Sequence, residues 1–184
     1  MIQTRIPEML LIAGTGRNSG KTTLACHIIK KTSADYPVVA IKITPHFHEN
    51  FGTGKTLFNR EDLVIIEESD PESGKDSALM IKAGAVKSYF VMAKDEQLNE
   101  ALQVILKHVP ENVPVVCESG GLRHIIEPGI FLMMDRKDNN MLKPGIDSLK
   151  KLANKVITFD GNNIDFDFNN VSYSENKWKI IAGK

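Results

Sequence analysis

The sequence has few cysteines and no excess of charge of either sign. Only two of its 184 residues are cysteine, Cys26 and Cys117, and they do not form a CxxC pair. Cysteines of this kind are usually buried, reduced thiols, which favours a reducing cytoplasmic compartment over a disulfide-rich secreted protein. The 23 basic residues balance the 23 acidic residues. This balance gives no electrostatic reason to expect nucleic acid or an anionic membrane as a partner.

Long hydrophobic runs are also missing. The apolar segment from Met9 to Ala13 is far shorter than the core of a signal peptide. No run approaches the roughly 20 apolar residues of a membrane span, so we expect a cytoplasmic protein. Hydrophobic residues still make up 42% of the chain. Length and composition therefore predict a single domain over residues 1–184 with a substantial core.

Apolar segments alternate with amphipathic segments along most of the chain, which is typical of an α/β fold. The predicted strands are 8–13, 38–43, 63–68, 88–93, 113–118, 130–134 and 155–160. The predicted helices are 21–31, 77–83, 96–108 and 146–153. Because most of these strands are continuously apolar, we expect a mostly parallel central sheet flanked by helices. Two regions differ: a polar, irregular excursion or hairpin at 44–76, and a C-terminal hairpin at about 164–181 that contains Trp178.

A glycine-rich loop joins the first predicted strand to the first predicted helix. It reads GTGRNSGKT over residues 14–22, and its end matches the Walker A pattern GxxxxGK[ST]. In such a loop, backbone N–H groups and the helix N-terminus attract phosphate, Lys21 reaches the β- and γ-phosphates, and Thr22 binds Mg²⁺. We therefore predict a nucleoside triphosphate site in a three-layer P-loop NTPase fold. The predicted binding residues of the loop are Gly16, Arg17, Asn18, Ser19, Gly20, Lys21, Thr22 and Thr23.

The loop departs from the Walker A pattern at its first position. Thr15 stands where the leading glycine is expected, between Gly14 and Gly16, which is consistent with a longer loop that begins at Gly14. A second GTGKT stretch, at 52–56, has no buried strand before it and no amphipathic helix after it. We therefore assign no second phosphate site there.

An acidic residue, Glu118, ends the fifth predicted strand and precedes two glycines. A carboxylate at this edge of a parallel sheet can hold Mg²⁺ through water or polarise the attacking water. We predict Lys21 and Glu118 as catalytic residues and Thr22 and Glu118 as metal-binding residues. The alternative is a solvent-facing glutamate at a strand end. Asp135 and Asp160 also follow apolar runs, but neither is followed by a pair of glycines, so both are weaker candidates.

Other polar residues have two interpretations each. Arg17 either clamps a phosphate or faces solvent. Lys42, at the end of the second predicted strand, contacts phosphate or substrate, or is a solvated strand end. His46 and His48 contact substrate or phosphate, bind a metal, or lie in a solvated loop. The guanine-reading pattern NKxD is absent, and DRKD at 135–138 is either a base contact or a turn, so both ATP and GTP remain candidates.

Three stretches in the first half of the chain resemble motifs of the molybdopterin-guanine dinucleotide biosynthesis protein B (MobB) family. They are NSGKTTL at 18–24, IKITPHFH at 41–48, and GKDS at 74–77 followed by AGA at 83–85. The resemblance implies a GTPase-like P-loop fold, GTP with Mg²⁺, a homodimer, and a role as an adapter in molybdenum cofactor maturation. It places Lys42, Lys75 and Asp76 at the site and Glu118 at the Walker B position. The chain departs from the family in Thr15, in its thinned histidine run and in its longer excursion before GKDS.

A second family is also similar. The loop has the spacing of the dethiobiotin synthetase loop, GTxxxxGKT, and ESGGL at 118–122 is similar to that family's EGAGG segment. Lys42 matches its strand-two lysine. This resemblance implies an ATP-dependent ligase or small-molecule kinase, but the chain is short for that family and GKDS followed by AGA is not its signature. We therefore predict slow Mg²⁺-dependent hydrolysis of GTP rather than ATP, with the ligase and a scaffold with a vestigial site as alternatives.

Overall fold

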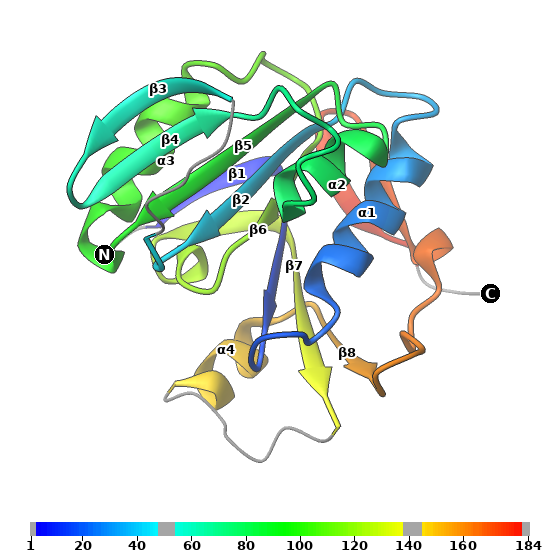
Figure 1. The fold of residues 1–184 in the computed structure, drawn as a ribbon. Coiled ribbons are helices and arrows are strands. Elements are labelled where there is room, and N and C mark those ends of the chain that lie inside the picture. The colour runs from blue at the N-terminus through cyan, green and yellow to red at the C-terminus, as the bar shows by residue number, and fades with distance from the viewer. Residues whose placement is uncertain (1–2, 48–53, 138–144, 182–184) are drawn as a thin grey trace.

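The computed structural model describes residues 3–47, 54–137 and 145–181. In these residues the chain forms an α/β fold whose central sheet has eight strands and is mostly parallel (Figure 1). Its strands are β1 (Thr4–Gly14), β2 (Val39–Thr44), β3 (Lys55–Arg60), β4 (Leu63–Glu67), β5 (Lys87–Ala93), β6 (Val115–Glu118), β7 (Ile126–Arg136) and β8 (Lys155–Phe159). The α-helices are α1 (Lys21–Thr32), α2 (Asp76–Lys82), α3 (Leu98–Leu106) and α4 (Ile146–Leu152). No helix in these described ranges is long and apolar enough to cross a membrane.

The strand order of the sheet is β3-β4-β5-β2-β6-β1-β7-β8. The strands from β5 to β8 in this order are parallel to their neighbours, whereas β3 and β4 form an antiparallel hairpin beside β5. Because parallel strands all end at the same edge of a sheet, the segments that follow β1, β2, β6, β7 and β8 meet there. The loop that joins β1 to α1 therefore lies beside the ends of β6 and β7.

Helices cover both faces of the sheet (Figure 1). The side chains of β1 alternate between the two apolar layers: Leu10 and Ile12 pack in the cluster that contains α1, and Met9 and Leu11 pack in the cluster that contains α3 and α4. All four are 0% exposed. Burial on both faces explains why this strand is a continuous apolar run in the sequence.

The strands β1 and β7 are longer than the sequence predicted. Each has 11 residues, because their amino-terminal halves also pair with each other, across a register shift between Ile6 and Leu10. Polar residues in these halves hide the strands from a hydrophobicity pattern. At Gly129 an added Cβ atom would lie 2.1 Å from the carbonyl oxygen of Pro7, so this close approach of the two strands requires glycine.

The region predicted as an excursion or hairpin at 44–76 contains the β3–β4 hairpin. The predicted strand 63–68 is confirmed as β4, which pairs with β5. Strand β3 was not predicted, because its exposed lysine, threonine, asparagine and arginine side chains give no apolar alternation. His48 and the first two residues of the GTGKT stretch at 52–56 lie outside the described residues.

A separate two-stranded sheet lies within the predicted C-terminal hairpin, made of β9 (Val171–Ser174) and β10 (Lys177–Ile180). Trp178 is 3% exposed and its indole N–H donates to the carbonyl oxygen of Glu8 at 2.8 Å. Its ring packs edge to face against the ring of Tyr173, with the two ring centroids 5.5 Å apart. The Lys31 ammonium of α1 donates to two backbone carbonyls just before and at the start of β9. These contacts fix the hairpin on the α1 face of the sheet.

Candidate functional site

The loop between β1 and α1 is curled by two glycines. A Cβ atom at Gly14 would lie 2.3 Å from the hydroxyl oxygen of Ser19, so the loop closes on itself there only because residue 14 is glycine. Gly20 has φ 80° and ends the loop in the left-handed conformation directly before α1. Thr15 is buried, and its N–H donates to the carbonyl oxygen of Met134 at 3.0 Å. The residue that departs from the Walker A pattern is thus anchored to β7.

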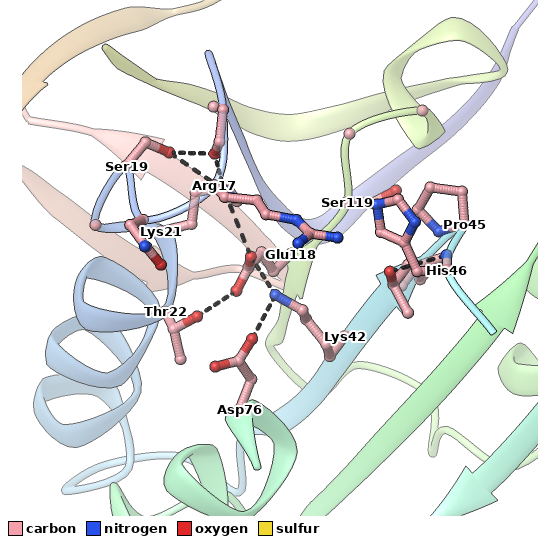
Figure 2. Close-up of a pocket in the computed structure, with 18 of the residues that line it drawn as sticks. Arg17, Ser19, Lys21, Thr22, Lys42, Pro45, His46, Asp76, Glu118 and Ser119 are labelled. Atoms are coloured by element: carbon pink, nitrogen blue, oxygen red, sulfur yellow. Dashed lines mark hydrogen bonds and ion pairs between the residues drawn. The ribbon is translucent and has the colours of Figure 1, made fainter. Parts of the chain in front are cut away.

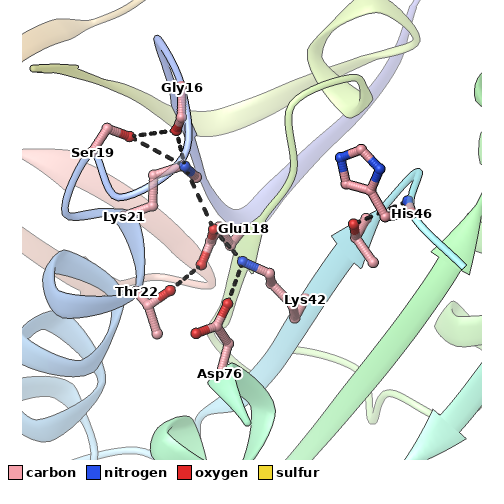
Figure 3. A network of polar contacts seen from close by, with 9 residues as sticks. Gly16, Ser19, Lys21, Thr22, Lys42, His46, Asp76 and Glu118 are labelled. Atoms are coloured by element: carbon pink, nitrogen blue, oxygen red, sulfur yellow. Dashed lines mark hydrogen bonds and ion pairs between the residues drawn. The ribbon is translucent and has the colours of Figure 1, made fainter. Parts of the chain in front are cut away.

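Lys21 lies across the inside of this loop (Figure 3). Its ammonium donates to the carbonyl oxygen of Gly16 at 2.8 Å and to the hydroxyl oxygen of Ser19 at 3.2 Å. The same ammonium is 4.0 Å from Oε1 of Glu118. The lysine therefore points from the start of α1 toward the end of β6, rather than outward into solvent.

Four side chains from four elements form one chain of polar contacts, drawn in Figures 2 and 3. The hydroxyl group of Thr22 in α1 donates to Oε2 of Glu118 at 2.8 Å. Oε1 of Glu118 accepts a hydrogen bond from the ammonium of Lys42 in β2. Lys42 also pairs with Oδ2 of Asp76, the first residue of α2, at 2.7 Å. Parallel pairing places Lys42 opposite Glu118 in the sheet, so the strand order accounts for their contact.

Charge pairing sets the protonation of Lys42. Burial alone lowers its pKa, but the charge of Glu118 and the hydrogen bonds to Asp76 and Glu118 outweigh burial, so the pKa is raised above its usual range. Lys42 is therefore a cation at neutral pH. Glu118 is 1% exposed, and the Thr22 hydroxyl and the Lys42 ammonium donate to its carboxylate in place of water.

A cavity of about 1030 Å³ follows this edge of the sheet. Its lining comes from both sides of β1 in the strand order. Phe90, His46 and His124 lie in β5 and after β2 and β6, whereas Arg136 and Phe159 end β7 and β8. Such a volume is at the upper limit of ordinary ligand pockets, which makes it large enough for a nucleotide and a second small molecule.

The structure brings most of the predicted site residues to this cavity. The lining includes Gly16, Arg17, Asn18, Ser19, Gly20, Lys21, Thr22, Thr23, Lys42, Asp76 and Glu118. Lys75 is not part of this lining; its ammonium lies 5.9 Å from the centroid of the Phe90 ring. His46 lines the cavity and is exposed.

The two other aspartates at strand ends have local partners. Oδ2 of Asp135 pairs with the Lys150 ammonium at 2.6 Å. Oδ1 of Asp160 accepts from the N–H groups of Asn162 and Asn163, at 2.9 and 2.7 Å, and so shapes a turn. These contacts explain both residues without a ligand.

Phe159 is a cavity residue that sequence reasoning did not single out, and Arg136 was considered only within the DRKD stretch. The Phe159 ring is so close to the loop that a Cβ atom at Gly20 would lie 3.0 Å from it. The Arg136 guanidinium donates to the carbonyl oxygen of Asn18 at 3.0 Å. Both residues end parallel strands, β8 and β7, and that position is the signal by which they could be found. Arg136 belongs to the DRKD stretch considered for the base; Asp138 lies outside the described residues.

The donor set suits a hard cation that is shared with a ligand. A threonine hydroxyl and a glutamate carboxylate supply oxygen, which Mg²⁺ prefers. Within the described ranges, no group of three or more histidine, cysteine or carboxylate side chains is arranged to hold a metal by itself. A cation at Thr22 and Glu118 would therefore depend on additional oxygens from phosphate and water.

Comparisons with known proteins give no further assignment. No protein-family model, curated protein or solved structure matches this chain. The interpretation of the site therefore depends on its own residues and their geometry.

Proposed function

We propose that this chain is a Mg²⁺-dependent P-loop protein that binds a nucleoside triphosphate and hydrolyses it slowly. One observation carries the proposal: the Thr22 hydroxyl donates to Glu118 at 2.8 Å, while the Lys21 ammonium lies 4.0 Å from the other oxygen of the same carboxylate. A lysine and a hydroxyl at a helix N-terminus, beside a carboxylate on the adjacent strand, are the groups that a triphosphate and its metal require.

The roles of the residues follow from their positions. Backbone N–H groups of the loop and the N-terminus of α1 would attract the phosphates, and Lys21 would exchange the Gly16 carbonyl for phosphate oxygens. Thr22 and Glu118 would hold Mg²⁺, which when bound supplies charge neutralisation at the phosphates. Glu118 would also orient the attacking water. Catalysis by positioning and charge neutralisation alone gives slow turnover.

The nucleotide and the pathway rest on the sequence motifs. We favour GTP over ATP, a homodimer, and an adapter role in molybdenum cofactor (molybdopterin guanine dinucleotide) biosynthesis, with a protein of that pathway as the partner. The support is the order NSGKTTL, IKITPHFH, GKDS and AGA along the chain.

A thermal-shift panel of nucleotides with Mg²⁺ tests the proposal. A ligand at 100 times its Kd stabilises the folded state by about 2.7 kcal/mol, which for a chain of this size raises Tm by roughly 5–10 °C. We expect the largest shift with GTP and no shift in Lys21→Ala. Lys151→Ala is the control, because Lys151 is exposed and outside the cavity lining. The absence of a shift with every triphosphate would contradict the proposed function, and an equal shift in Lys21→Ala would contradict the site.

A second candidate function is an ATP-dependent ligase or kinase that phosphorylates a small carboxylate. The observation that favours it is the size of the cavity, about 1030 Å³, and its lining, which extends past the loop to His46, Phe90 and His124. ATP consumption that rises sharply with diaminopelargonic acid would support this function. Turnover that does not respond to the acid, together with GTP selectivity, supports the adapter.

A further inference from the structure

Glu68, directly after β4, is a buried carboxylate outside the cavity. It is 7% exposed. Its Oε1 accepts from the N–H groups of Ser69 and Asp70, at 3.1 and 3.0 Å. Its Oε2 accepts from the hydroxyl group of Ser77 at 2.9 Å. Burial of a carboxylate is unfavourable unless such donors replace water, so this side chain is held in one position by several partners at once.

These hydrogen bonds connect the two ends of one segment. Ser69 and Asp70 begin the connection from β4 to α2, and Ser77, which is 0% exposed, lies in the first turn of α2. Glu68 is itself tied to the sheet, because its N–H donates to the carbonyl oxygen of Ser88 at 2.8 Å. The carboxylate therefore fixes the start of α2 relative to the sheet.

The residue placed by this arrangement is Asp76. It directly precedes Ser77, and its carboxylate pairs with the Lys42 ammonium at 2.7 Å. Lys42 in turn contacts Glu118, which accepts from the hydroxyl of Thr22. A displacement of Ser77 would therefore alter the positions of Thr22 and Glu118, the proposed metal-binding pair. The three contacts in between are Asp76–Lys42, Lys42–Glu118 and Glu118–Thr22.

We propose that Glu68 is a positioning residue: through Ser77 it holds the Asp76 carboxylate against Lys42, and so sets the geometry of Lys42 and Glu118 at the nucleotide site. This inference rests on the proposed function. Glu68 does not touch the cavity and acts only through the segment that it orders.

Three variants separate this role from a general loss of packing. Glu68→Ala removes every hydrogen bond of the carboxylate. Ser77→Ala removes only the bond to α2. Glu68→Gln keeps one acceptor oxygen for the two N–H groups and offers an amide that can donate to the Ser77 hydroxyl, so it should restore the wild-type behaviour.

The experiment is a double-mutant cycle on nucleotide hydrolysis, with Asp76→Ala as the second change. We expect Glu68→Ala to lower kcat by about tenfold, because small misplacements of site residues have effects of this order. KM should change little, since the loop itself is untouched. In the Asp76→Ala background, Glu68→Ala should cause no further loss. Glu72→Ala is the matched control: it removes an exposed carboxylate of the same segment, whose ion pair with Lys82 at the end of α2 is screened by solvent and contributes little.

Several outcomes would overturn the inference. One is that the double mutant loses the product of the two single-mutant effects on kcat, so that Glu68→Ala and Asp76→Ala act independently. Another is that Glu68→Gln lowers kcat as much as Glu68→Ala does. The last is that Glu72→Ala lowers kcat by the same factor. If Glu68→Ala does not fold, Ser77→Ala takes its place in the cycle.

A second readout needs no nucleotide. The backbone amide resonances of Asp76 and Lys42 should shift in Glu68→Ala and Ser77→Ala but not in Glu72→Ala or Glu68→Gln. Unmoved resonances would overturn the positioning role even if hydrolysis is observed. If the wild-type protein binds no nucleotide, the proposed function fails, while these resonances still decide whether Glu68 places Asp76.

Discussion

Among single residues, Lys42 has the most consequential position, between two carboxylates. The variant Lys42→Met would remove the closer of the two ammonium groups beside the buried Glu118 and leave only Lys21, at 4.0 Å. Breaking a buried pair in this way is expected to lower the free energy of unfolding by about 3 kcal/mol, the lower end of the usual range, because water in the cavity screens Asp76. Urea denaturation measures this loss.

A divalent cation should partly replace the missing ammonium. Mg²⁺ at about 10 mM is enough to occupy even a weak carboxylate site. We expect this concentration to raise the free energy of unfolding of Lys42→Met more than that of the wild type. Lys151→Met, which removes an exposed lysine, is the control. Unchanged stability in Lys42→Met would show that Glu118 is solvated rather than dependent on Lys42.

A second prediction for a single residue concerns the thiol of Cys26. Burial, and then the negative charges of Asp76 and Glu118, raise the pKa of its thiol to about 11. The reactive thiolate is the charged form, so it stays scarce at neutral pH. The alkylation rate of Cys26 by iodoacetamide should therefore keep rising with pH through pH 10, as followed by mass spectrometry. A plateau near pH 8.5, about the ordinary thiol value, would contradict the environment described for Cys26.

The sequence alone identified those site residues that stand in a recognisable local motif. Lys21 and Thr22 stand in a glycine loop at a strand-to-helix junction, and Glu118 ends an apolar run before two glycines; all three line the cavity. Glu68 and Phe159 stand in no such pattern. Phe159 contacts the loop at Gly20, which is distant in the sequence. The donors to Glu68 are nearby, at Ser69, Asp70 and Ser77, but they form no recognised motif with it.

At the scale of elements, the C-terminal hairpin depends on one aromatic side chain. Trp178→Ala should lower the free energy of unfolding by about 3–5 kcal/mol, because it leaves a cavity against Tyr173 and removes the hydrogen bond to Glu8. Trp178→Phe should cost less, since the ring is retained. Far-UV circular dichroism in urea measures both. An effect of Trp178→Ala no larger than that of Lys177→Ala, an exposed change on the same strand, would show that the hairpin contributes little.

Periodicity predicted the buried elements well and the exposed ones poorly. Strands β2, β4, β5 and β6 follow apolar runs almost to the residue, because burial on two faces leaves few polar positions. Strand β3 is held by its backbone hydrogen bonds to β4 and carries exposed polar side chains. Its strand character is therefore a property of its neighbour and is invisible in its own composition.

At the scale of the whole molecule, the single-domain organisation stays a prediction with a direct test. Trp178 is the only tryptophan of the chain, so its fluorescence reports the hairpin, while far-UV circular dichroism reports the helices and the sheet. If the chain unfolds as one unit, the two urea transitions coincide. A fluorescence transition at lower urea would show instead that the hairpin leaves the sheet before the rest unfolds.

The balance of charge around Glu118 has a kinetic consequence. Two ammonium groups, Lys21 and Lys42, lie beside two carboxylates, Glu118 and Asp76, so their potentials largely cancel beyond a Debye length of about 8 Å. An approaching anionic ligand would therefore experience little long-range electrostatic attraction from these four side chains. In stopped-flow measurements, the association rate constant of the proposed nucleoside triphosphate should vary by less than about threefold between low and high ionic strength. Electrostatically steered binding depends much more steeply on ionic strength.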